Sequence, residues 1–335
     1  MRNILFRPRK NIKLILNYVV GPLVFCLVLY SIYRQVQRQP DWKQSVHQLF
    51  EAFSGESLLM LLGVFMLMFF NWGIEARKWQ ISLKNVQELS LGRALKGVFT
   101  GNTMALFTPN RVGEYVGRII YVKEDKRLAS MPLTFVCSIA QLIVTFIAGL
   151  CGMLYLRDTA INEGFHFIWF NLLWSTIAVV AVILILIYFR LSMIVGWIGR
   201  FAFMKNIRKY IDVLKNFEAT VLFRILSLSA GRYLVFLVQY YLLFSAFGVD
   251  IGWWECFFSV SVVFLTLAII PSIAVFTDLG IRWKTSMELV TIYSSNTVGI
   301  LAASFAIWII NLVIPALIGS LLILSVRLFR EEKEG

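Results

Sequence analysis

The stretch LFTPNRVGEYVGRIIYV (residues 106–122) follows a short apolar run and combines helix-breaking residues with charged ones. Pro109 and Gly113 interrupt a helix, and Arg111, Glu114 and Arg118 come at or just after the break. The place of this stretch in the fold decides how the whole chain is threaded. The composition of the chain indicates whether this stretch lies in a membrane or in water.

The composition is that of an integral membrane protein. Of the 335 residues, 59% are hydrophobic and 15% charged, and the mean hydropathy is +0.75. The net charge of +13 is dispersed between apolar runs, which favours cytoplasmic loops and anionic lipid over nucleic acid. Full membrane spans are predicted at about 14–33, 57–74, 129–156, 167–189, 225–247 and 297–326.

The charges of the loops decide how two further apolar stretches, 92–107 and 254–273, are placed in the membrane. The sixteen residues of 92–107 make about 24 Å of helix, too short for a hydrocarbon core about 30 Å thick. If this stretch crossed fully, the basic 190–224 segment would lie outside, against the positive-inside rule. It is therefore predicted to be re-entrant, and so is 254–296. The expected fold is an all-α polytopic membrane protein with six full spans, two re-entrant hairpins and both termini in the cytoplasm.

This order of segments divides one membrane domain (1–335) into two halves. Each half reads span, span, hairpin, span, over about 1–156 and about 167–326, and three crossings per half give the halves opposite orientation. Inverted repeats with Gly- or Pro-broken segments at matching positions are typical of secondary transporters. The connection 190–224 is predicted to form amphipathic helices on the inner leaflet or, alternatively, a helix packed under the bundle.

The two hairpin tips carry the candidate binding residues. At the first tip, irregular backbone at membrane depth requires a polar surrounding, so Asn110, Arg111, Glu114 and Arg118 face a partner or a ligand. One interpretation has the arginines binding an anionic group such as a lipid phosphate. The other has local ion pairs, Arg111–Glu114 and Glu114–Arg118, that hold the turn. Asp278 and Arg282, at the second tip, offer the same choice.

Other polar residues inside the spans are weaker candidates. Arg232 either extends to the interface, the favoured interpretation, or lines a pathway. Gln141 and Gln239, like Asn71, Asn171 and Asn311, join helices or line that pathway. Interfacial anchors are predicted at Trp72, Trp79, Trp174, Trp253 and Trp254. The isolated cysteines and histidines indicate no disulfide framework, metal site or cofactor.

At the two tips the sequence resembles the membrane domain of the lysylphosphatidylglycerol synthase family. The elements that carry the resemblance are TPNRVGEYVGR (108–118), IIPSIAVFTDLGIR (269–282) and the last span, IWIINLVIPALIGSLLIL (307–324). Asn110 stands where that family usually has Gly. The resemblance implies a domain that moves aminoacylated phosphatidylglycerol between leaflets. The chain ends about ten residues after its last span, so no synthase domain is expected.

The leading hypothesis is a lipid flippase or lipid-linked carrier in a bacterial inner membrane, not an enzyme, whose substrate is an anionic or aminoacylated phospholipid. A polyprenyl-linked glycosyl transferase would use Asp41, Glu51 or Glu56 of the first outer loop. An accessory protein would instead dock a cytoplasmic enzyme on the basic 190–224 surface, at Lys205, Arg208 and Lys209. Transport of a small molecule is a further alternative.

Overall fold

The computed structural model describes residues 57–198, 210–270 and 278–325, together with isolated positions between 26 and 47. The described residues form helices and no strands, which confirms the predicted all-α fold. Five helical segments are long and apolar enough to cross a membrane. They are α4 (Ser57–Leu83), η1 with α7 (Glu124–Lys126 and Arg127–Tyr155), α9 (Phe167–Phe189), α12 (Ala219–Ala246), and the continuous run of α15, η4 and α16 (Thr297–Trp308, Ile309–Val313 and Ile314–Ser325).

These five segments match five of the six predicted spans, and the first predicted span, 14–33, lies outside the residues described continuously. Helix α4 continues to Leu83, nine residues beyond the predicted end at 74. The charged residues after 74 suggested that the span ends there. The side chains of Glu75 and Lys78 are buried inside the protein, so the helix continues through them. Helix α12 likewise begins at Ala219 rather than 225.

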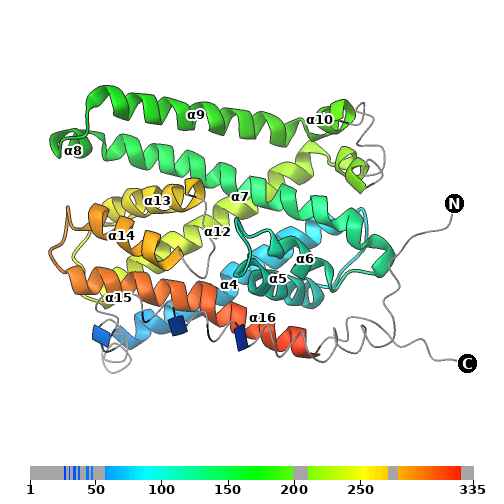
Figure 1. Cartoon of the computed structure of the whole chain (residues 1–335), viewed down its shortest axis with the longest axis horizontal. Helices are drawn as coiled ribbons and strands as arrows, with labels where there is room; N and C mark the ends of the chain where they lie inside the picture. Colours follow the sequence, from blue (N-terminus) through cyan, green and yellow to red (C-terminus); the bar gives the residue numbers. More distant parts are fainter. Residues whose placement is uncertain are drawn as a thin grey trace, which may run out of the picture.

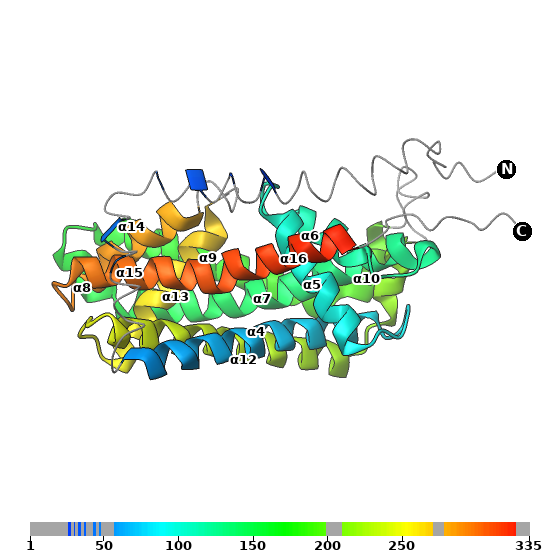
Figure 2. The ribbon, with the colours of Figure 1, turned by 90° about the horizontal axis from the view of Figure 1, so that it is seen from below.

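The long helices lie roughly along one axis and pack in layers (Figure 1). Helices α4 and α12 pack side by side, and α7 contacts both of them as well as α9 (Figures 1 and 2). Helix α9 is the peripheral member, because most of its residues are exposed and most of the exposed ones are aliphatic or aromatic. Such a surface suits contact with lipid chains, whereas α7 and α15 are largely buried.

Two pairs of shorter helices lie toward opposite ends of the long axis (Figure 1). Helix α5 (Leu91–Ala105, 15 residues) packs against α6 (Gly113–Ile119), and α13 (Trp253–Ile269, 17 residues) packs against α14 (Asp278–Val290). At 1.5 Å per residue, α5 is only about 22 Å long, less than a full bilayer core. The segment joining α13 to α14 lies outside the described residues.

Glycines allow α6 to lie directly against α5. A Cβ on Gly117 would come within 2.5 Å of the Gly101 Cα atom and the Thr100 carbonyl oxygen. The Thr100 hydroxyl donates a hydrogen bond of 2.8 Å to the Gly117 carbonyl, which fixes this contact. Small residues at such contacts are the usual means of close helix packing in membranes. Helix α5 also packs along α16, where Thr103 Oγ1 donates to the Ala316 carbonyl at 2.8 Å.

The remaining elements are short. They are α8 (Arg157–Asn162), α10 (Leu191–Ile198) and the 3-10 turn η3 (Asp212–Asn216). Helix α10 and η3 pack together within the 190–224 connection, of which residues 199–209 lie outside the described part. The last span contains the π-helical turn η4, so one extra residue is accommodated between α15 and α16.

Candidate functional site

The turn between α5 and α6 holds two residues in the left-handed backbone region. Asn110 has φ 49° and Arg111 has φ 61°. Asn tolerates this region, whereas for a residue such as Arg it costs about 1–2 kcal/mol. Side-chain contacts help to hold Arg111 there: Nη2 donates to Asn102 Oδ1 at 3.0 Å, and Nε lies 3.5 Å from Glu114 Oε2. The Gly113 N–H, which donates to Thr108 Oγ1 at 2.7 Å, closes the turn.

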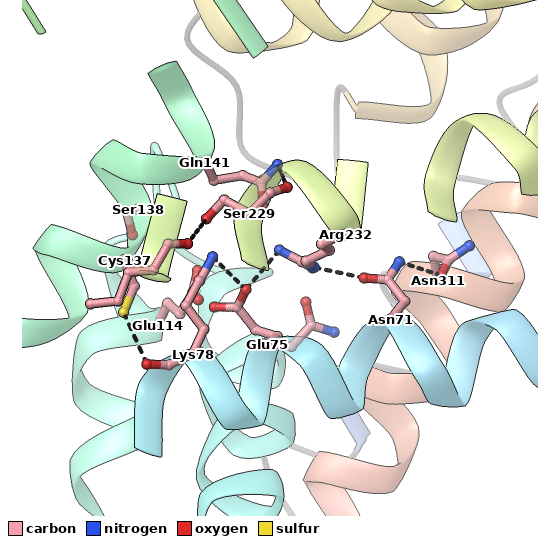
Figure 3. A network of polar contacts seen from close by, with 12 residues as sticks. Asn71, Glu75, Lys78, Glu114, Cys137, Ser138, Gln141, Ser229, Arg232 and Asn311 are labelled. Carbon is pink, nitrogen blue, oxygen red and sulfur yellow. Dashed lines mark hydrogen bonds and ion pairs between the residues drawn. The ribbon is translucent and has the colours of Figure 1, made fainter. Parts of the chain in front are cut away.

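Glu75 on α4 is the centre of a buried ion-pair network (Figure 3). Its Oε2 atom accepts from Lys78 Nζ at 2.8 Å and from Arg232 Nη1 at 3.0 Å. Its Oε1 atom accepts from Arg118 Nη2 at 2.6 Å, and the same guanidinium pairs with Glu114. Glu75 is 3% exposed, so all three cations meet it away from water. The network therefore joins α4, α6 and α12.

A row of amide side chains continues from Arg232 across the bundle. Arg232 Nε donates to Asn71 Oδ1 at 2.7 Å, and Asn71 Nδ2 lies 3.4 Å from Asn311 Oδ1 (Figure 3). Asn311 Nδ2 then donates to Gln239 Oε1 at 3.1 Å, and Gln239 Nε2 to the Val64 carbonyl at 2.9 Å. These amides join α4, α12 and the η4 turn. The prediction that they connect helices is confirmed for Asn71, Gln239 and Asn311.

At the start of α14, the second tip presents a charged pair. Arg282 Nη2 lies 3.2 Å from Asp278 Oδ2, and Arg282 Nη1 donates to the Tyr240 hydroxyl at 2.8 Å. Both charged side chains are about 15% exposed, so this pair is largely enclosed. The pair links α14 to α12, the helix that also carries Arg232.

Residues of the α5–α6 turn and of the start of α14 line one cavity of about 370 Å³. This central cavity is bounded by α4, by the α5–α6 pair, by α7, α12 and α13, by the start of α14, and by α15 with η4. Its polar lining is Glu75, Lys78, Asn102, Asn110, Arg111, Glu114, Tyr115, Ser138, Gln141, Thr145, Arg232, Asp278, Arg282 and Asn311. Its apolar wall includes Trp72, Phe236, Phe264, Leu267 and Trp308. A volume of this size is in the range of small-ligand sites.

Positive charge exceeds negative charge around the cavity. The network linked through Glu75 contains two carboxylates and four cations, so its formal net charge is +2. Asp278 and Arg282 cancel each other. The two carboxylates are those of Glu75 and Glu114, and the four cations are Lys78, Arg111, Arg118 and Arg232.

The structure brings most of the predicted site residues together. Asn110, Arg111, Glu114, Gln141, Arg232, Asp278 and Arg282 all line the central cavity. Arg118 lies behind it, 2% exposed, in ion pairs with Glu75 and Glu114. Gln239 is also buried away from the cavity, in the amide row. The local pairs considered for each tip are present, and they coexist with an open cavity.

Two interpretations of the sequence are wrong. Arg232 does not extend to the membrane interface; its side chain is 14% exposed, contacts the rings of Trp72 and Phe236, and pairs with Glu75. Trp72 and Trp79 are not interfacial anchors, since both are buried in the core. Gly97 of α5 lies so close to the Trp79 ring that a Cβ there would be 2.7 Å away. Helix α5 therefore covers a face of α4 that composition alone had predicted to lie at the membrane interface.

Glu75 and Lys78 were missed because the predicted span ended at residue 74. A signal for them was present: Asn71, Glu75 and Lys78 are spaced four and three residues apart, on one face of a helix. Among the described residues, no group of three or more His, Cys, Asp or Glu side chains is arranged to hold a metal ion. Cys137 and Cys256 are free and buried, in accordance with a packing role.

The fold and the cavity define a polytopic membrane protein with a charged, partly open cavity between its helices. A family model described as the lysylphosphatidylglycerol synthase TM region matches residues 14–319. The chain belongs to this family, which confirms the resemblance seen at the two tips and in the last span. No curated protein matches the chain. Membership places the protein in a lipid-related family of membrane domains.

Proposed function

We propose that this protein moves a phospholipid between the two leaflets of a bacterial inner membrane, as a flippase or lipid-linked carrier and not as an enzyme. The substrate is a phospholipid with an anionic or aminoacylated headgroup. The observation that carries the proposal is the central cavity, in which charged residues from both hairpin tips meet. The family match supports a lipid as the substrate.

The arrangement of the short helices supports a transport cycle. The α5–α6 and α13–α14 pairs approach the cavity from opposite ends of the molecule (Figure 1). Under our proposal both pairs are re-entrant hairpins, related by an inverted repeat, and each opens the cavity toward one leaflet. Broken segments that meet at a central site are the usual construction of alternating-access carriers.

The cavity suits a headgroup rather than a whole lipid. Its volume of about 370 Å³ leaves no room for two acyl chains, which would stay in the bilayer while the headgroup crosses. Arg111 and Arg282, one from each tip, are placed to bind the phosphate, because guanidinium groups bind phosphate oxygens in a bidentate manner. Partial removal from water strengthens such contacts.

The proposal is tested with purified protein in vesicles that contain acyl-labelled phospholipids. Loss of fluorescence to a membrane-impermeant reductant reports how fast lipid reaches the outer leaflet. Arg111→Ala and Arg282→Ala should each slow the accelerated movement strongly, whereas Arg93→Ala should not, because Arg93 is exposed in the first turn of α5, away from the cavity. Normal movement in both cavity variants would contradict the proposal. A folded protein that accelerates no lipid would favour a docking function.

A further inference from the structure

We infer that the central cavity selects a headgroup that carries phosphate and no amine, so that the substrate is an anionic phospholipid rather than an aminoacylated one. This inference rests on the proposed function and narrows its substrate. The observations that carry it are the excess positive charge of the network, the pairing of each described carboxylate that lines the cavity, and the guanidinium groups that remain open to a ligand.

The first observation is the charge. Four cations and two carboxylates are linked around Glu75, and the Asp278–Arg282 pair adds no net charge. The sequence PSIAVFT (271–277), which precedes α14, contains no ionisable side chain. Because most of these side chains are buried, a net charge of +2 among them is unfavourable, and an anionic ligand relieves it. A lysyl-phosphatidylglycerol headgroup, whose two ammonium groups outweigh its phosphate, would increase it.

The second observation is that the carboxylates are occupied. Glu75 accepts from three cations, and Glu114 pairs with Arg111 and Arg118. Asp278 pairs with Arg282. An incoming ammonium group would have to displace a guanidinium or lysine that is already in place. Among the described residues that line it, the cavity therefore offers an amine no carboxylate that lacks a cationic partner.

The third observation is the set of donors that remain. Arg111 Nη1 and Arg232 Nη2 make no hydrogen bond to any residue that the structure describes, while the other nitrogens of these guanidinium groups do. Arg111 is 42% exposed, and its contact with Glu114 is long, at 3.5 Å. Its side chain can turn to a phosphate without breaking a strong ion pair. Both arginines line the same cavity.

The test compares three acyl-labelled lipids in phosphatidylcholine vesicles that contain the full chain. These are phosphatidylglycerol, lysyl-phosphatidylglycerol and phosphatidylethanolamine, the last of which has a phosphate and an amine with no net charge. We expect phosphatidylglycerol to move at least about tenfold faster than either amine-bearing lipid. Lysyl-phosphatidylglycerol moving as fast as phosphatidylglycerol, or faster, would overturn the inference and leave the flippase proposal standing.

A binding measurement separates the two proposals. Dihexanoyl-phosphatidylglycerol, added to the protein in detergent, should raise the apparent unfolding temperature, and its lysyl ester should not. That result without movement of any lipid would contradict transport and support the headgroup inference. If phosphatidylglycerol neither moves nor stabilises the protein, both proposals are overturned.

A charge variant provides the matched control. Arg111→Gln lowers the network charge to +1 and should reduce the preference for phosphatidylglycerol over its lysyl ester several-fold, through slower movement of phosphatidylglycerol. Arg93→Gln removes one positive charge from the same hairpin away from the cavity and should leave the preference unchanged. Equal preferences in the two variants would contradict the assignment, provided that circular dichroism shows both to be folded.

Discussion

Replacement of Glu75 by Gln should destabilise the protein strongly. The substitution keeps the shape of the side chain but removes the charge that holds Lys78, Arg118 and Arg232. The network charge then rises from +2 to +3 around a position that is 3% exposed. Breaking a buried ion pair from one side costs about 3–5 kcal/mol, because the remaining charge is left uncompensated. By the scaling of soluble domains, this corresponds to a drop of at least about 5 °C in unfolding temperature.

The assay is thermal unfolding in detergent, followed by loss of α-helical circular dichroism. Glu88→Gln is the matched control, because Glu88 is exposed just beyond the end of α4. The double variant Glu75→Gln/Lys78→Met removes one charge of each sign and should recover part of the lost stability. An unfolding temperature for Glu75→Gln equal to that of Glu88→Gln would refute the central role of the carboxylate.

Two further variants test the packing around the site in the same unfolding assay. Gly117→Ala places a methyl group against Gly101 and should lower the free energy of unfolding by about 1–3 kcal/mol through overpacking. Gly92→Ala, with open space around it, should be neutral or slightly stabilising, and equal effects of the two variants would show that α5 and α6 are free to separate. Asn311→Leu leaves Asn71 Nδ2 and Gln239 Oε1 without a partner and should cost about 1–3 kcal/mol for each buried group, whereas Asn171→Leu, at a partly exposed position of α9, should be tolerated. A stable Asn311→Leu protein would argue against the amide row.

The spans were predictable because the length of an apolar run and the thickness of a bilayer are independent of tertiary structure. The pairs Glu114–Arg118 and Asp278–Arg282 were predictable for a similar reason, since a spacing of four residues puts two side chains on one helix face. Local rules therefore gave the helices and the short-range contacts of the site.

Contacts between distant segments could not be read in the same way. Glu75 meets Arg118 and Arg232, which are 43 and 157 residues away, and no local spacing connects them. For Arg232, the sequence favoured the interface, because an isolated charge near a helix end is best placed there in the absence of a partner. The ion pair with Glu75 on α4 instead favours a position of Arg232 inside the bundle.

The π-helical turn at Ile309–Val313 has a mechanical consequence for the last span. One added residue rotates everything after it by about 100° relative to a regular α-helix, so the two halves of the span present different faces. The half before the turn contacts α12 and α14, and the half after it contacts α5. The turn sets the rotational phase of each half separately. Shortening the 309–313 segment by one residue would restore a regular helix and turn the Thr103-bonded side of α16 away from α5.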